Sequence, residues 1–202
     1  MATHTWVDLK IPEASLLADL NGIVSDLQRA REFSELLISQ YCADPPNWQM
    51  AEPLSVAIAV TYSRAFSKGV RHHLNESDLG MLSVSQRETH IFMRAYRDKH
   101  IAHSVNEFEE NIVRAQYCLE RVKTEGITAI GYGGARITGL GSDKINELIE
   151  ITKILENDVR IRITEEEKRL LSMVRALPLE EVLQGGQKAF QPILGNVSKR
   201  RK

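Results

Sequence analysis

The chain has 202 residues, of which 43% are apolar and 26% are charged; this usage is typical of a globular protein and excludes a wholly disordered one. The 26 Lys and Arg residues and 27 Asp and Glu residues give a formal net charge of -1, so any anion-binding site must be local. The longest near-apolar stretch, 54–60, is far shorter than the roughly 20 residues that span a bilayer. We therefore expect one cytoplasmic domain, with or without an appendage, and no membrane partner.

Two long patterns of apolar residues open the chain. Between Pro12 and about Tyr41, apolar side chains recur at steps of three and four residues, which predicts an amphipathic helix. A second helix is predicted from about Gln49 to Gly69, with the glycine as a C-terminal cap. The segment 74–83 is rich in turn-forming residues and is predicted to be a loop.

Two capping boxes follow, and each predicts a helix start. Ser85-Gln-Arg-Glu88 opens a third helix, in which a hydroxyl and a carboxylate satisfy two backbone N–H groups reciprocally. Ser104-Val-Asn-Glu107 opens a fourth helix, which continues to about Leu119. The chain therefore breaks near His103, which is predicted to lie at a helix end.

After Gly126 the apolar pattern changes to period two, which is typical of strands. Segments 127–130 and 135–138 flank Gly133-Gly134, a pair that tolerates the positive φ angles of a tight turn. A single β-hairpin is marginally stable alone, so we expect it to lie on the helices or to pair with another copy.

A long helix is predicted from about Asp143 to Ala176, with Ser142 as its N-cap. A helix of roughly 34 residues is about 50 Å long, which is more than a small bundle covers, so we expect a second subunit along it. Thr164-Glu-Glu-Glu167 is an alternative helix start that would divide this segment into two helices.

The predicted fold class is therefore all-α, an antiparallel helical bundle with an inserted two-stranded β-hairpin and a long C-terminal helix. The bundle is assigned to 1–125 and the hairpin to 126–141. The long helix, packing on the bundle or on a second subunit, is assigned to 142–184. An irregular basic tail occupies 185–202.

The segment from Arg94 to Ser104 holds two arginines, a lysine and two histidines, the densest group of anion-binding and proton-transferring side chains in the chain. Arg94, Arg97, His100 and His103 are spaced by three, so a continuous helix would align them in one drifting row. Arginine binds phosphate through a two-pronged fork, and histidine gives or takes a proton near neutral pH. Together such groups could bind and cleave a phosphodiester without a metal.

The run Arg97-Asp-Lys-His-Ile-Ala-His103, with five residues between the Arg and the last His, resembles the signature of the HEPN superfamily (higher eukaryotes and prokaryotes nucleotide-binding domain). The resemblance implies a four-helix bundle and a homodimer whose paired sites form a metal-independent ribonuclease of the toxin or antiviral type. It implies that Arg97 stabilises the phosphorane and that His103 transfers a proton. It also implies RNA or a nucleotide as ligand and an antitoxin or regulatory protein as a partner.

We assign candidate catalytic roles to two residues and substrate-binding roles to five more. The catalytic candidates are Arg97 and His103; the substrate-binding candidates are Arg94, Asp98, Lys99, His100 and Arg64.

Two alternatives remain open for this segment. In the first, Arg97 and Asp98 pair with neighbouring side chains and His103 only caps a helix end. In the second, the protein is a non-catalytic helical dimer with an interaction, regulatory or nucleotide- or RNA-binding role.

No metal and no other cofactor is expected. Cys42 and Cys118 lie far apart with no Cys-x-x-Cys pattern, which argues against a structural zinc site or a disulfide scaffold. His100 and His103 could supply two metal ligands, but no Glu-x-x-His pairs on other helices supply the facing carboxylates.

Overall fold

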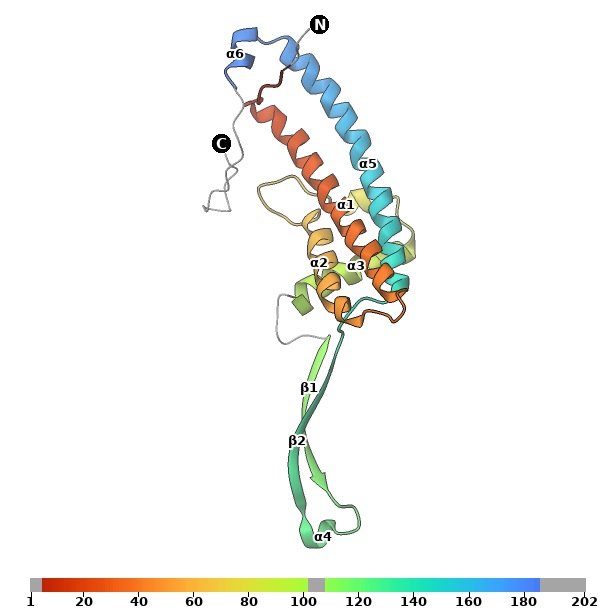
Figure 1. The fold of residues 1–202 in the computed structure, drawn as a ribbon. Coiled ribbons are helices and arrows are strands. Elements are labelled where there is room, and N and C mark those ends of the chain that lie inside the picture. Colours follow the sequence, from red (N-terminus) through yellow and green to blue (C-terminus); the bar gives the residue numbers. More distant parts are fainter. Residues whose placement is uncertain (1–4, 102–107, 186–202) are drawn as a thin grey trace.

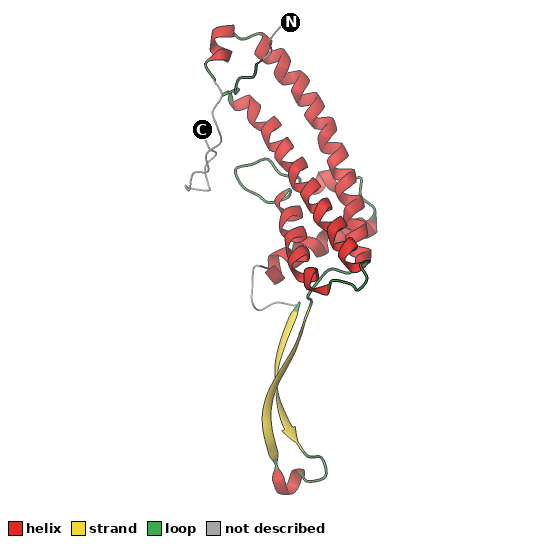
Figure 2. Cartoon of the chain, viewed as in Figure 1, coloured by secondary structure: helices red, strands yellow, loops and turns green. Residues whose placement is uncertain are grey.

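The computed structural model describes residues 5–101 and 108–185. Two parts are distinct: a helical body, formed by 5–101 and 137–185, and a projecting two-stranded arm, formed by 109–136 (Figures 1 and 2). The described chain is thus mostly helical with one small antiparallel sheet, as the sequence predicts. Within these ranges, no helix combines the length and the apolar character needed to cross a membrane.

The two longest helices are α1 (Ser15–Tyr41) and α5 (Ser142–Arg175). They run in opposite directions and pack along one another (Figure 1). Their bounds confirm the two segments predicted from the period of 3.6. α5 is continuous, so Thr164 does not begin a new helix, and its N-cap is Gly141 rather than Ser142.

The core of the body is filled from four helices. α2 (Ala51–Arg64) packs on α1, and α3 (Val84–Ala95) packs on α2 and α5. Fully burying an Ile or Leu side chain contributes about 1.5–3 kcal/mol, so this core is the main source of the body's stability. Side chains that lose all or nearly all of their exposure include Ile23, Leu27, Ile58, Tyr62, Met93, Tyr96, Ile145 and Leu148.

Several helix ends differ from the predicted positions. α2 ends at Arg64, not at Gly69. The predicted loop 74–83 contains a 3-10 turn, η3 (Glu76–Leu79). The capping box of α3 is formed by Ser83 and Gln86, because the helix begins at Val84 and Ser85 already lies in its first turn; the hydroxyl of Ser85 donates to Glu147 of α5 at 2.5 Å.

The predicted fourth helix is wrong in its described part. Residues Glu109–Tyr117 form strand β1, which pairs antiparallel with β2 (Ile127–Arg136). The spacing of apolar residues in this segment fits period 3.6 and period two alike, and pairing with β2 satisfies the backbone N–H and C=O groups along the strand. His103 and the capping box at 104–107 lie outside the described residues.

The hairpin itself is confirmed, but its predicted boundaries and turn are wrong. The strands are joined through 118–126, which contain the short helix α4 (Val122–Glu125) and Gly126 with φ 63°. Gly133 and Gly134 lie inside β2, opposite Ile112 and Asn111. A Cβ on Gly134 would lie 2.3 Å from the carbonyl oxygen of Glu110, so this glycine permits close approach across the ladder, not a turn.

Three further short elements lie at the ends of the long helices and before α2. η1 (Pro12–Ala14) leads into α1, and η2 (Trp48–Met50) leads into α2. α6 (Leu179–Leu183) follows α5.

Candidate anion-binding cleft

A cleft of about 760 Å³ lies between the segment after α2 and the end of α3. It brings together side chains from 66–79 and from the helical run that begins with α3. Its lining residues are Phe66, Ser67, Lys68, His73, Leu74, Asn75, Glu76, Leu79, His90, Arg94, Arg97 and Asp98. Three full cations and two histidines therefore face one open space together with two carboxylates.

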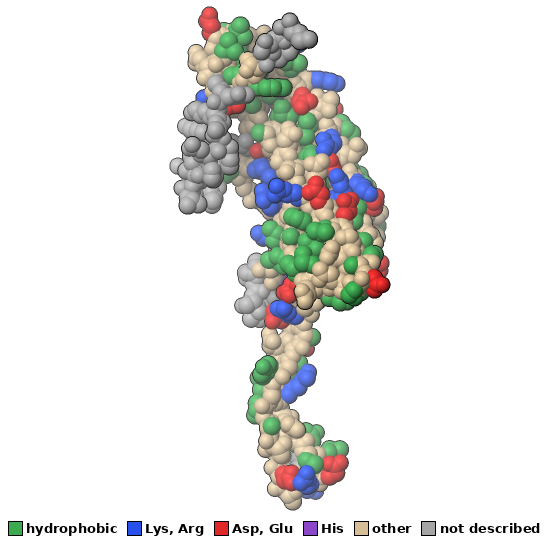
Figure 3. Space-filling model, viewed as in Figure 1, with side chains coloured by type: hydrophobic (Ala, Val, Ile, Leu, Met, Phe, Trp, Pro, Cys, Tyr) green, Lys and Arg blue, Asp and Glu red, His purple; other side chains and the backbone are tan. Residues whose placement is uncertain are grey.

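Charge on the face shown in Figure 3 is interleaved: Lys and Arg side chains alternate with Asp and Glu over the body, and no continuous basic surface covers it. This distribution agrees with the nearly neutral net charge of the chain. Attraction of an anion therefore depends on the local arrangement inside the cleft.

A π-helical segment, η4 (Tyr96–Ile101), continues α3 and carries Arg97 and Asp98 at the cleft. A π-helix is wider than an α-helix, and such segments occur frequently at functional sites. Tyr96 is fully buried and anchors the segment in the core.

Arg94 lies on the last turn of α3 and packs against the cleft wall. Its guanidinium carbon is 5.7 Å from the centre of the Phe66 ring, a cation–π distance. Its Nη1 donates to the carbonyl oxygen of Phe66 at 3.5 Å, and its Nε is buried with no hydrogen-bond acceptor among the described residues. A buried N–H without a partner is costly; because this atom is closed to solvent, it could meet a ligand oxygen only if the side chain turned into the cleft.

Arg97 lies nearer the rim of the cleft. Its side chain is 45% exposed, and its Nη1 donates to the Asp98 carboxylate at 2.7 Å. An exposed ion pair of this kind contributes about 0–1 kcal/mol, so a phosphate could replace Asp98 as the partner of Arg97 at small cost.

His90 lines the cleft from α3 and is almost fully buried. The Tyr62 hydroxyl lies 2.8 Å from its Nδ1, and the Phe66 ring packs edge-on against it with centroids 4.6 Å apart. Burial, with a smaller contribution from the charge of Arg94, lowers the pKa of His90 to about 4. The imidazole is therefore neutral at pH 7, and Tyr62, whose pKa burial raises, stays protonated.

The remaining sequence candidates lie elsewhere. Arg64 does not line the cleft; its Nε lies 3.2 Å from a carboxylate oxygen of Asp26 on α1. His100 packs its ring against Tyr96 and Phe108, with centroids 4.9 and 5.8 Å apart, and neither it nor Lys99 lines the cleft. The π-helical segment explains this separation, because its wider turn breaks the row expected from a step of three. His103 lies outside the described residues.

Lys68, His90 and Glu76 are cleft residues that received no role from the sequence. His90 had a usable signal, since it precedes Arg94 by four residues on the same helix and must share its face. Lys68 and Glu76 had none, because their position depends on how the segment after α2 folds back onto α3.

No family model, curated protein or solved structure matches this chain. In residues 5–101 and 108–185, no three His, Cys, Asp or Glu side chains converge as a possible metal site. The side chains that line the cleft, with their two guanidinium groups and one ammonium group, are suited to binding an oxyanion.

Proposed function

We propose that this cleft binds the phosphates of RNA. The observation that carries the proposal is the convergence of Lys68, Arg94 and Arg97 on one open space. Arg94 offers a guanidinium held against Phe66 at the cleft wall, and Arg97 offers an exposed guanidinium. Guanidinium groups bind phosphate oxygens through paired, charge-assisted hydrogen bonds.

The binding is expected to be modest and dependent on salt. Glu76 and Asp98 line the same cleft and offset part of its positive charge. For a single strand, each neutralised phosphate contributes about -0.7 to the slope of log K against log salt concentration. Two or three such contacts predict a slope of about -1.4 to -2.1.

The test is fluorescence polarisation with a labelled single-stranded RNA, comparing the natural chain with Lys68→Gln and Arg97→Gln. Each substitution should weaken binding about tenfold and reduce the salt slope by about 0.7. Arg64→Gln is the matched control, because Arg64 pairs with Asp26 outside the cleft, and its affinity should not change. Absence of RNA binding, or equal losses in the control, would refute the proposal.

Cleavage of the bound RNA is the second candidate function, favoured by the resemblance of Arg97 to His103 to the HEPN signature and by the place of Arg97 at the cleft. In this proposal the RNA 2′-hydroxyl attacks the adjacent phosphorus and the 5′-oxygen leaves with a proton, giving a 2′,3′-cyclic phosphate. Arg97 would stabilise the charge of the phosphorane and His103 would transfer a proton. The resemblance extends the proposal to a four-helix bundle, a homodimeric site and a toxin restrained by an antitoxin.

Cleavage is tested with metal-free protein and a mixed RNA pool, followed by analysis of the new ends. Cyclic phosphate ends made by the natural chain, and not by folded Arg97→Ala or His103→Ala, are the expected result. Persistent cleavage by both variants would contradict the assigned roles. Binding without any fragments would leave the non-catalytic alternative.

A further inference from the structure

The two faces of the arm differ in chemistry. Residues that pair in an antiparallel ladder share a face, and neighbours along a strand alternate. The register therefore gathers most of the apolar side chains on one side, which we call the apolar face: Val113, Ala115, Tyr117, Ile130 and Tyr132, with Ile127, which pairs with Tyr117 after a register shift between Gln116 and Tyr117. The opposite face consists largely of small or polar residues: Ile112, Arg114, Gln116, Ala129, Gly131 and Gly133.

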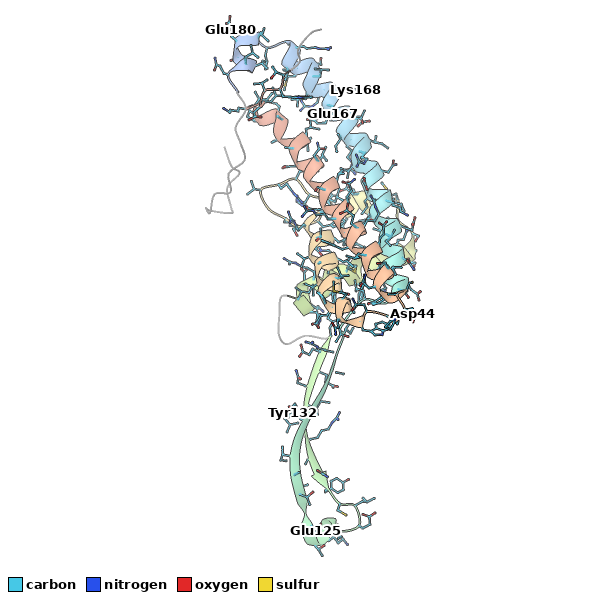
Figure 4. All side chains as sticks on the ribbon, viewed as in Figure 1. Asp44, Glu125, Tyr132, Glu167, Lys168 and Glu180 are labelled. Carbon is cyan, nitrogen blue, oxygen red and sulfur yellow. The ribbon has the colours of Figure 1, made fainter. Side chains whose placement is uncertain are left out.

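The apolar face is open to solvent within the described chain. Tyr132 is 95% exposed, Val113 75% and Ile130 69%, and no residue of 109–136 with a described side chain is buried. Tyr132 lies near the middle of the arm, outside the helical body (Figure 4). Monomeric proteins rarely expose a continuous apolar strip of this kind, and such strips mark interaction sites.

We propose that the apolar face packs against the apolar face of the arm in a second copy of this chain, with the two arms antiparallel. A twofold axis makes one surface complementary to itself. Two stacked hairpins would then bury Tyr132 and Ile130 of both copies between them, in the manner of facing sheets about 10 Å apart.

The charges of the arm fit a second copy better than a nucleic acid. The arm carries as many acidic as basic side chains, Glu109, Glu110, Glu120 and Glu125 against Arg114, Arg121, Lys123 and Arg136. Being neutral, it neither repels its copy nor attracts a polyanion.

The same charges favour the antiparallel orientation. Glu109, Glu110 and Arg136 lie at the base of the arm, which is net negative. Glu120, Arg121, Lys123 and Glu125 lie at the tip, which is neutral. Parallel arms would place the base carboxylates of the two copies beside each other, which is repulsive. Antiparallel arms place the neutral tip of each copy near the net-negative base of the other and avoid this repulsion.

The area that a stable interface requires also favours contact between the arm tip of one copy and the arm base of the other. Strands of 9 residues are about 30 Å long, and a two-stranded face is about 10 Å wide. Two such faces cover roughly 600 Å², which is less than the about 1,200 Å² of a stable interface. Antiparallel arms supply more, because the exposed tip residue Leu119 then reaches the partner's body at the arm base.

An apolar contact for the tip is present at that base. Trp48 is 65% exposed and lies against Tyr41, with ring centroids 5.1 Å apart. The Tyr41 hydroxyl donates to the carbonyl oxygen of Leu140 at 2.9 Å, and Arg136 pairs with Glu52 at 3.0 Å. These bonds fix the arm beside Trp48, so a twofold dimer gains two tip-to-base contacts.

The first test is sedimentation velocity at about 10 µM on the full chain, with Ile130→Glu and Ala129→Glu. Ile130 and Ala129 are exposed neighbours in β2 that lie on opposite faces. The two variants therefore introduce the same charge, one on the apolar face and the other on the opposite face. We expect a dimer for the natural chain and for Ala129→Glu, and a monomer for Ile130→Glu. A monomeric natural chain, or a dimer that survives Ile130→Glu, would overturn the proposal.

The second test uses the two native cysteines, so its main result comes from the natural chain. Cys42 is exposed at the end of α1, near the arm base, and Cys118 lies at the arm tip. Within one chain they are separated by about the arm length of roughly 30 Å, beyond the reach of a short bismaleimide. Antiparallel arms predict an interchain link between Cys42 and Cys118, identified by peptide mapping and lost in Cys42→Ser.

The alternatives give different results in this second test. Links between two Cys118 residues alone would indicate parallel arms and overturn the stated orientation. No interchain link would mean that another partner covers the apolar face, which also counts against the proposal.

Discussion

The helical body and the arm use similar apolar side chains in opposite ways. Ile58 and Leu148 lose all their exposure between the helices of the body, whereas Ile130 and Tyr132 keep most of theirs on the arm. Burial from water is what makes an apolar side chain stabilising. The body therefore supplies its own stability, and the apolar residues of the arm can contribute only when another surface covers them.

The largest expected effect is the difference in stability between a side-chain truncation in the body and one in the arm. Leu148→Ala should lower the free energy of unfolding by about 2–5 kcal/mol, because it leaves a cavity in the core. Ile130→Ala should change the free energy of unfolding of the dilute protein by less than about 0.5 kcal/mol. Urea unfolding followed by tryptophan fluorescence at low protein concentration measures both. Equal losses would mean that arm and body share a cooperative core.

A second effect belongs to the body and depends on pH. The pKa of His90 in the folded protein, about 4, lies below the about 6.5 of an unfolded histidine. Between these values the unfolded chain binds more protons, so stability falls as the pH is lowered from about 6.5 to 4, by roughly 2.5 kcal/mol.

The measurement is urea unfolding of the natural chain and His90→Gln at several pH values. The natural chain should lose more stability over this interval than the variant does. Parallel pH profiles would show that His90 is not the group responsible.

The smallest expected effect is confined to the arm. Gly134→Ala places a Cβ against the carbonyl oxygen of Glu110, whereas Gly131→Ala meets no atom within 4 Å. Gly134→Ala should therefore raise amide hydrogen exchange in β1 about tenfold, about 1.4 kcal/mol, and leave the exchange of α1 and α5 unchanged. Gly131→Ala should leave β1 unaltered; faster exchange there would show that any side chain, not the close approach, opens the ladder.

Sequence patterns located the body well and the arm less well. The helices 12–41 and 143–176 were predicted to within three residues of α1 and α5, because a long amphipathic period is a local property. A hairpin was predicted, but the segment that forms β1 was assigned to a helix and the turn was placed at Gly133-Gly134. The spacing of apolar residues in 109–117 fits a helix and a strand alike. The hydrogen-bond partners that make this segment a strand lie in β2.

The cleft shows the same division. The group of cations at 94–100 was visible in the sequence, and Arg94, Arg97 and Asp98 do share the cleft. His100 and Arg64 do not, because a π-helical turn and an ion pair with Asp26 place them elsewhere.

The sequence by itself determined a mostly helical protein with two long amphipathic helices, a β-hairpin and a local cluster of arginines, since each depends on residues close together in the chain. The tertiary structure decided which segment pairs with β2, which cations face one cleft and which face of the arm is apolar. These features depend on contacts between distant residues, such as Phe66 with Arg94 at the cleft wall and Ala115 with Ile130 across the ladder. Local periodicity carries no information about such contacts, because they form only when separate elements pack together.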